Sequence, residues 1–410
     1  MNPKPNKYDP SKDETLVRPD RAILRDIFPS EVAKNISLDD CKVISTSSET
    51  CVFHIRLDAS PVPGWPVNLL IRLDDAAASG CSLAAVTELQ HLARFELRDL
   101  IPKVLLVGSA TSLAGRNLEF SVRPYLYGTM AVLDDVWSGL SPENQRALVD
   151  AAVGAMVKLQ KLLAVKRPRV RRFLHAHAHP DTDIDSGFRD VIGGPNGGYF
   201  DGIKQLLQAC LGEERFTRRV CEIVDTEDGI AVRSTRDDIG SVELSQSDMD
   251  DLMKHAVLCH NDLEPRSIFV RRVDNRGSGS SNGWYELAAI FDWQSAGFFP
   301  FAYEYANKDG DLGSVTRWTS WYLLYKERAT SLLPKGESHE KLIRALDIIT
   351  RSRDDISFRI KAKPIKRERL EWPSGPRRGW VREAGISPED VPVFTKEDIE
   401  AEFLEELEHR

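Results

Sequence analysis

The chain has 410 residues, which is enough for one large domain or for two lobes with substantial cores. Its net charge of −8 argues against nucleic acid as the main partner, because nucleic-acid-binding proteins usually carry a basic surplus. No apolar stretch approaches the length of a membrane span, and the N-terminus lacks the apolar region of a signal peptide. The six cysteines are scattered without CxxC spacing, which indicates reduced thiols. We therefore expect a cytoplasmic protein with no nucleic-acid or membrane partner.

The first third of the chain alternates strand-like runs with one helix. Residues 1–20 are polar and proline-bearing and are expected to form a flexible tail. A helix with an apolar face is predicted after Ser82, a typical N-cap residue. Short runs rich in β-branched and large apolar residues predict four strands, at 51–57, 67–73, 103–107 and 118–122.

The rest of the chain has a mostly helical pattern. Ser141 followed by Pro142 predicts a helix start, and apolar residues recur at helical spacing up to Leu163. A further helix near the C-terminus is predicted from the capping pattern of Thr395 and Asp398. The order of elements predicts an α+β fold with two lobes, a small β-rich N-lobe over 21–126 and a larger helical C-lobe over 127–410.

Two acidic motifs carry the chemistry of the sequence. The first is the run from His260 to Val270, which contains Asp262 and Ser267, and the second places Asp292 thirty residues after Asp262. The intervening residues fit a β-hairpin, within 256–293, whose tip is the turn-rich segment 274–283. Two carboxylates brought together in this way are typical of phosphoryl transfer, in which one orients a hydroxyl nucleophile and the other holds metal against nucleotide phosphates.

These two motifs, with the later Glu304, resemble the aminoglycoside phosphotransferase-like kinases, in particular the large fungal branch of that family. The resemblance covers roughly residues 43–305 and implies a protein-kinase-like fold that binds ATP with Mg²⁺. It implies that Asp262 is the catalytic base and that Asp292 and Ser267 are the metal ligands.

The resemblance also implies a set of nucleotide-binding residues. Arg72 matches a basic residue on the third strand that contacts the phosphates, and Glu88 matches its ion-pair partner. Ser47 and Ser48 lie in the expected phosphate-covering loop, residues 44–50. The hinge that would bind adenine through backbone groups includes Arg123 and Tyr125.

Three departures from the family pattern leave two functions open. Ser267 stands where the family has a metal-binding Asn, Arg72 replaces the usual Lys, and the phosphate-covering loop contains no glycine. The first hypothesis is an ATP-dependent phosphotransferase that moves the γ-phosphate to a hydroxyl group of a small molecule. The alternative is a pseudokinase, a nucleotide-binding or scaffold protein with weak or no transfer. The sequence identifies neither the acceptor nor the oligomeric state.

Two further patterns have simpler interpretations. His175, His177 and His179 would share a face in an extended strand and could bind a transition metal, as in a metal hydrolase, but an exposed polar loop is the favoured interpretation. The basic run 166–172 could be an import signal or a patch for acidic substrates, although a solvated loop is favoured. His260 is expected to brace its loop. The aromatic group Trp318, Trp321, Tyr322 and Tyr325 is expected mainly in the core.

Overall fold

The structure is a computed structural model that describes residues 16–78, 80–126, 130–181, 190–212, 220–237, 239–273, 284–311, 318–361, 365–372 and 375–382. The chain divides into two compact units, one formed by Met1–Gly139 and Pro265–Ala296 and the other by Leu140–Glu264 and Gly297–Arg410. Each unit is therefore assembled from segments that are far apart in the sequence. This division differs from the predicted lobe boundary at 126/127, because residues 130–139 and the hairpin segment 265–296 belong to the first unit.

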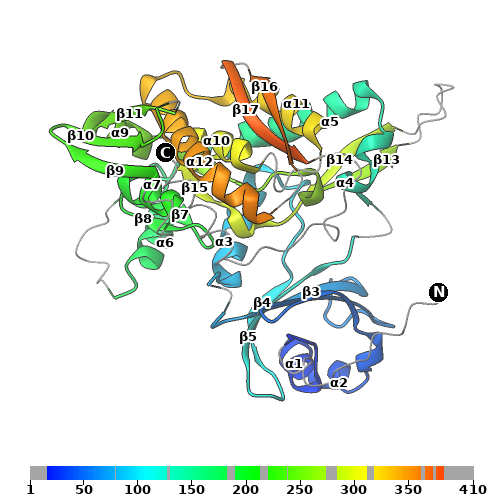
Figure 1. Ribbon diagram of the computed structural model, residues 1–410. Coiled ribbons are helices and arrows are strands. Elements are labelled where there is room, and N and C mark those ends of the chain that lie inside the picture. The colour runs from blue at the N-terminus through cyan, green and yellow to red at the C-terminus, as the bar shows by residue number, and fades with distance from the viewer. Residues whose placement is uncertain are drawn as a thin grey trace, which may run out of the picture. The chain divides into compact units, whose positions relative to one another are not determined.

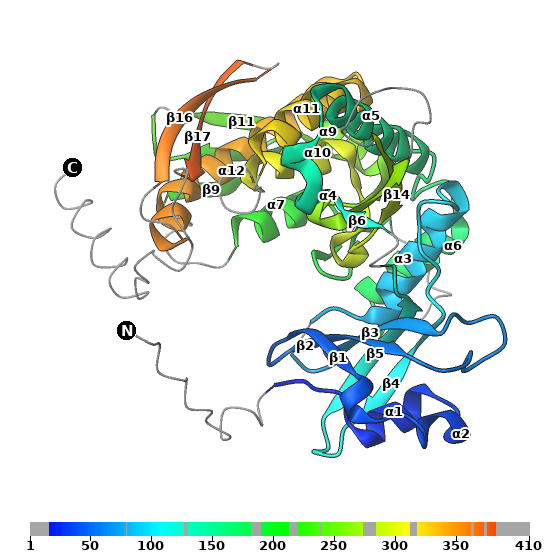
Figure 2. The same ribbon diagram turned by 90° about the vertical axis from the view of Figure 1, so that its right-hand side faces the viewer.

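The first unit is built around a five-stranded antiparallel sheet in the order β1-β2-β3-β5-β4. Figure 1 shows β3 and β5 side by side, and in Figure 2 α1 and α2 lie on one side of the sheet and α3 on the other. The elements of this sheet layer are β1 (Lys42–Thr46), β2 (Thr50–Arg56), β3 (Asn68–Asp75), β4 (Leu106–Thr111), β5 (Asn117–Pro124), α1 (Arg21–Ile27), α2 (Ser30–Ala33) and α3 (Leu83–Glu96).

In the central strands β2 and β3, buried apolar residues alternate with partly exposed ones. In β2, Cys51, Phe53 and Ile55 are fully buried while the residues between them are partly exposed. These side chains join one core with residues from α1 and from the segment before it. Val17 belongs to that core, and its N–H donates to the Ser47 carbonyl (2.8 Å). The predicted tail is therefore wrong at Val17, which is packed into this core, and at Asp20, which caps α1; residues 1–15 lie outside the described residues.

Helix α3 begins where the sequence predicts it. The Ser82 hydroxyl accepts a hydrogen bond from the Ala85 N–H, and the apolar face that includes Val86, Leu89 and Ala93 is buried. A second cap comes from β5, where the Glu119 carboxylate accepts hydrogen bonds from the Ser82 hydroxyl (3.3 Å) and from the Leu83 N–H. A negative charge at a helix N-terminus is favourable, so Glu119 ties α3 to the sheet.

The predicted hairpin is present in the first unit. Strand β13 (Ile268–Val273) pairs antiparallel with β14 (Trp284–Ile290), and β13 also pairs with β6 (Ala131–Val132). Helix α4 (Leu133–Val136) follows β6. The predicted tip of the hairpin, residues 274–283, lies outside the described residues.

The second unit combines helices with two small sheets, β11-β10-β9 and β12-β15-β7-β8, and the strand pair β16–β17. Figure 1 shows β9, β10 and β11 beside α9. Its helices are α5 (Pro142–Leu159), α6 (Pro168–Ala178), α7 (Ile203–Leu211), α9 (Gln246–Lys254), α10 (Phe301–Asp311), α11 (Thr319–Ala329) and α12 (Glu337–Lys361). Its strands are β7 (Ile192–Gly194), β8 (Gly198–Phe200), β9 (Cys221–Thr226), β10 (Gly229–Ser234), β11 (Ser241–Ser245), β12 (Ala256–Cys259), β15 (Gly297–Pro300), β16 (Ile365–Trp372) and β17 (Gly375–Arg382).

The predicted α+β class is confirmed, with a sheet-based first unit and a second unit rich in helices. The helix start at Ser141 and Pro142 is also confirmed, because the Ser141 hydroxyl caps α5. The second unit contains more strand than the sequence pattern predicted. The helix expected near Thr395 lies outside the described residues, and no helix in the described ranges is long and apolar enough to cross a membrane.

Candidate functional site

Arg72 lies on β3, and its ion-pair partner lies on the same strand. The Arg72 Nε donates to Asp74 Oδ1 (2.7 Å), and the Asp74 carboxylate is buried while Arg72 is partly exposed. The two side chains face the same way because residues two apart on a strand share a face. The sequence predicted Glu88 as the partner; Glu88 lies on α3, and the carboxylate that contacts Arg72 is Asp74. An Arg bound through Nε keeps both Nη groups for a ligand.

Arg123 and Asp292 belong to the same group of charges. Burial, with a contribution from the positive charge of Arg72, lowers the pKa of Arg123 to about 10, while Asp292 and Asp74 act in the opposite sense. For Arg72, burial alone would lower the pKa, but the hydrogen bond and charge of Asp74, together with Asp292, raise it. Two guanidinium groups therefore share the first unit with two carboxylates close enough to influence both.

This charge cluster has unsatisfied polar atoms. Asp74 Oδ2 and Arg123 Nε are buried and have no hydrogen-bond partner in the described part of the chain. The Ser121 hydroxyl, on β5, is also buried and has no hydrogen-bond partner among the described residues. Buried polar atoms are normally hydrogen-bonded, so exceptions call for a specific reason, such as a ligand that completes the site.

Asp292 is held next to Ser267 by the backbone. The Phe291 N–H donates to the Ser267 carbonyl (2.8 Å), and the Trp293 indole Nε1 donates to the Ile290 carbonyl (3.1 Å). Ser267 is buried at the end of a short 3-10 helix, Pro265–Ser267, that leads into β13. The main chain beside Asp292 is thus paired with the main chain of Ser267 within the first unit.

The two acidic motifs share an unusual backbone conformation. Asn261, which precedes Asp262, has φ 60°, and Asp292 has φ 59°. These are the two non-glycine residues with positive φ among the residues that the structure describes. Asn and Asp tolerate this region better than most residues, and such conformations gather at functional sites.

The expected phosphate-covering loop is a tight turn between β1 and β2. The Ser47 hydroxyl accepts hydrogen bonds from the N–H groups of Glu49 (3.1 Å) and Thr50 (3.0 Å). At the same turn the Ser48 carbonyl accepts from Arg116 Nη2 (2.5 Å). Backbone N–H groups that a glycine-rich loop would offer to phosphates are therefore already engaged here.

The expected adenine-binding segment is also partly engaged. The Tyr125 N–H donates to the Asn68 carbonyl (3.1 Å), and Pro124 has no N–H to offer. The Tyr125 ring stacks on His54 with 3.8 Å between ring centroids. This aromatic pair gives the end of β5 a fixed position.

In the second unit the loop that carries Asp262 is organised by Glu304 on α10. The fully buried Glu304 carboxylate accepts a hydrogen bond from the His260 N–H (3.1 Å), and His260 Nδ1 lies 3.3 Å from the Asp262 N–H. Burial raises the pKa of Glu304, although Lys308 and the backbone N–H groups of the loop oppose the rise. His260 is itself fully buried, in agreement with the bracing role expected for it.

A buried ion pair follows directly after Asp262. Lys308 Nζ lies 3.0 Å from Glu264 Oε1, and both side chains are almost completely buried. Asp262 is partly exposed by contrast. The carboxylate predicted to act as the base is therefore the more accessible of the two carboxylates in this loop. Nothing in the sequence pattern signalled the contact between Glu264 and Lys308, which are 44 residues apart.

The basic run 166–172 and the histidine cluster adopt a structure that was not expected. Residues 168–178 form helix α6, so most of the basic run and two of the three histidines are helical, not extended or in a loop. His177 Nδ1 is 2.8 Å from the Phe173 carbonyl, and His179 Nε2 is 2.7 Å from Asp201 Oδ1. The helix forms because Pro168 suits the first helical turn and because the buried residues Val170, Phe173 and Leu174 have helical spacing. The loop interpretation did not take these two signals into account.

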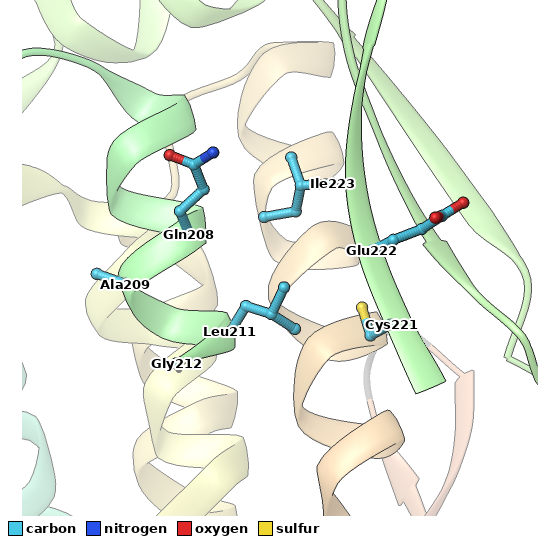
Figure 3. A pocket seen from close by; sticks show the side chains of 7 residues that line it. All are labelled: Gln208, Ala209, Leu211, Gly212, Cys221, Glu222 and Ile223. Atoms are coloured by element: carbon cyan, nitrogen blue, oxygen red, sulfur yellow. The ribbon is translucent and has the colours of Figure 1, made fainter. Parts of the chain in front are cut away.

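A cavity of about 600 Å³ lies elsewhere in the second unit, between α7 and β9. In Figure 3, Leu211 and Ile223 point into this space, and the Glu222 carboxylate points away from it. None of its lining residues belongs to the predicted site, so the charged motifs remain the better candidate for the chemistry.

No protein-family model and no curated protein matches the chain. Among solved structures it is similar to a thermostable mutant of aminoglycoside phosphotransferase APH(4)-Ia in its apo form, at 16% identity over 77% of this chain and 86% of that one, with a TM-score of 0.38. It is also similar to the GDP complex of wild-type aminoglycoside 2'-phosphotransferase-IIIa, at 15% identity over 82% and 88% of the two chains, with a TM-score of 0.39. Similarities this weak assign no residue and no substrate to this chain.

Proposed function

We propose that the protein is an ATP-dependent phosphotransferase that moves the γ-phosphate to a hydroxyl group of a small molecule. In the first unit, Arg72 and Arg123 would bind the nucleotide phosphates, and Asp292 with Ser267 would hold Mg²⁺. In the second unit, Asp262 would accept the proton of the acceptor hydroxyl. Bound Mg²⁺ would neutralise negative charge on the phosphates.

The observation that carries this proposal is the charge cluster of the first unit. Two arginines, a buried carboxylate and Asp292 influence one another, and Asp74 and Arg123 each leave a buried polar atom without a partner. Free Nη groups suit phosphate oxygens, and carboxylate and hydroxyl oxygens suit Mg²⁺. The residues present therefore fit a magnesium nucleotide.

A second candidate function is a pseudokinase that binds nucleotide without efficient transfer. The turn at Ser47 favours it, because its backbone N–H groups are engaged by the Ser47 hydroxyl and no glycine lets the backbone approach phosphates closely. Ser267 also offers one hydroxyl where an amide would be a stronger ligand.

The role of Asp262 separates the two candidates. After a screen of hydroxyl metabolites for ATP consumption, Asp262→Asn should reduce transfer to the acceptor by roughly 10²-fold or more, because the positioned proton acceptor is lost with little change in shape. Binding of ATP with Mg²⁺, measured by calorimetry, should change by less than about twofold.

Asp250→Asn is the matched control, since Asp250 is an exposed carboxylate of the same unit. It should leave both measurements unchanged. Equal transfer rates for Asp262→Asn and the wild type would rule out the role assigned to Asp262. Nucleotide binding without transfer to any acceptor would favour the pseudokinase.

A further inference from the structure

A cluster of three possible metal ligands lies in the second unit, outside the site described above. Asp251 and His255 come from the end of α9, and His339 comes from the first turn of α12. One ligand atom from each residue lies within 4.8 Å of the other two, and this is the only such group of three among the residues that the structure describes. The sequence signal is weak, because His339 lies 84 residues beyond His255.

His339 is the member that calls for an explanation. It is 2% exposed, and neither of its ring nitrogens has a hydrogen-bond partner among the described residues. Buried polar atoms are normally hydrogen-bonded, and an imidazole nitrogen without such a partner is the kind of atom that binds metal.

The other two residues lie close together. His255 Nδ1 is 3.2 Å from Asp251 Oδ1, near the edge of about 3.3 Å of a tetrahedron with metal bonds near 2.05 Å. The same nitrogen is 2.9 Å from the Asp251 carbonyl oxygen, which it would leave to bind a cation. The Ser338 hydroxyl donates to the other carboxylate oxygen, Asp251 Oδ2 (2.5 Å). Hydrogen bonds of this kind fix the orientation of a ligating carboxylate.

The residues around Asp251, His255 and His339 allow a cation to bind between them. Lys341 is a nearby positive group on α12, and it is bound by Asp248 (2.9 Å) and Glu337 (3.1 Å). The side chains of His255 and Asp251 are about half exposed, so water could fill the remaining coordination positions.

We propose that Asp251, His255 and His339 bind one zinc ion that clamps the end of α9 to the start of α12. Two imidazoles and one carboxylate suit zinc or a similar first-row cation, whereas Mg²⁺ and Ca²⁺ prefer oxygen ligands. The site is separate from the Mg²⁺ proposed at Asp292. Its expected effect is on stability, because a cation that binds only the folded protein stabilises it.

The test is titration of the metal-free full-length protein with ZnCl₂ in a buffer that contains millimolar Mg²⁺. Calorimetry should give one zinc per chain, and zinc at 100 times its dissociation constant should raise Tm by about 5 °C or more. His255→Ala and Asp251→Asn should each weaken zinc binding by at least about 10-fold, and Ser338→Ala should weaken it less, because it removes only an outer contact.

Two further variants complete the test. His179→Ala is the matched control, because His179 also pairs with a carboxylate, Asp201, at 2.7 Å but is not part of a three-ligand group in the described chain; zinc binding should be unchanged. Asp292→Ala should also retain its zinc. His255 is exposed, so its replacement should leave the apo protein folded. No zinc binding by the wild type, or binding that survives both His255→Ala and Asp251→Asn, would overturn the proposal.

Discussion

Arg72 and Asp74 illustrate what single residues do in this site. Their pairing follows from strand geometry, since positions two apart share a face, and the sequence Arg72-Leu73-Asp74 contains that information. The family resemblance instead made Glu88 the expected partner, and the three-dimensional distances show the contact between Arg72 and Asp74. The orphan Asp74 Oδ2 and Arg123 Nε could not be predicted, because burial of single atoms depends on packing.

Asp74→Ala should destabilise the protein by about 3 kcal/mol, because it leaves the guanidinium of Arg72 without its partner in a largely buried position. Urea unfolding measures the change. The matched control is Glu31→Ala, which removes the partner of Lys34 in a highly exposed pair of the same unit and should cost less than about 1 kcal/mol. Similar effects of the two substitutions would show that the Arg72–Asp74 pair is not a buried interaction.

Substitutions of Ser267 test whether this residue is a ligand of the proposed Mg²⁺. If the protein is an active phosphotransferase, Ser267→Asn should tighten binding of ATP with Mg²⁺ and raise turnover several-fold, because the amide oxygen is a better ligand. Ser267→Ala should weaken that binding. Calorimetry and steady-state rates measure both, and Tm identifies any variant that fails to pack, since Ser267 is buried. Turnover that is faster in the wild type than in Ser267→Asn would mean that serine is the adapted ligand here.

At the level of secondary structure elements, two capping signals and three of the four strand-like runs, 51–57, 67–73 and 118–122, are confirmed. Ser82 and Ser141 were predicted as helix caps and are caps in the structure. The run 103–107 was predicted as a strand, but β4 spans Leu106–Thr111, because pairing with β5 and not local hydrophobicity sets its ends. His175, His177 and His179 were interpreted as an exposed loop, with an extended strand as the alternative, although the preceding apolar residues have helical spacing.

The loop that carries Asp262, residues 260–264, contacts a titrating group, Glu304. Its native pKa is raised by burial above the ordinary 4.5, so the folded protein binds this proton more tightly than the unfolded chain does. The contribution of this raised pKa to the free energy of unfolding is present below pH 4.5 and is lost as the pH rises through the native pKa of Glu304. Glu304→Gln keeps an acceptor for the His260 N–H without titrating.

The free energy of unfolding of the wild type relative to Glu304→Gln should therefore fall as the pH is raised from about 4.5, by at most about 1.4 kcal/mol per pH unit. Urea unfolding of both proteins from pH 4.5 to 8 measures the difference. A difference that is constant, or that grows with pH, would show that Glu304 is not held at a raised pKa.

At the level of the whole molecule, the sequence predicted two lobes but not how the chain is divided between them. The chain passes from one unit to the other at Gly139, Glu264 and Ala296. The reason is a long-range pairing, Phe269 with Val132, that joins β13 to β6 within the first unit. A pattern read along the chain has no signal for such a pairing, whereas the order of two strands, one helix and two strands over residues 50–124 depends on local sequence and was predicted.

The central claim is that the first unit binds a magnesium nucleotide through Arg72, Arg123 and Asp292. Thermal unfolding of the full chain with ATP, with and without Mg²⁺, tests it most directly. ATP with Mg²⁺ at 100 times its dissociation constant should raise Tm by several degrees, on the order of 5 °C, and Asp292→Ala should lose the Mg²⁺-dependent part. A wild-type protein whose Tm does not change with millimolar ATP and Mg²⁺ would contradict both the phosphotransferase and the pseudokinase.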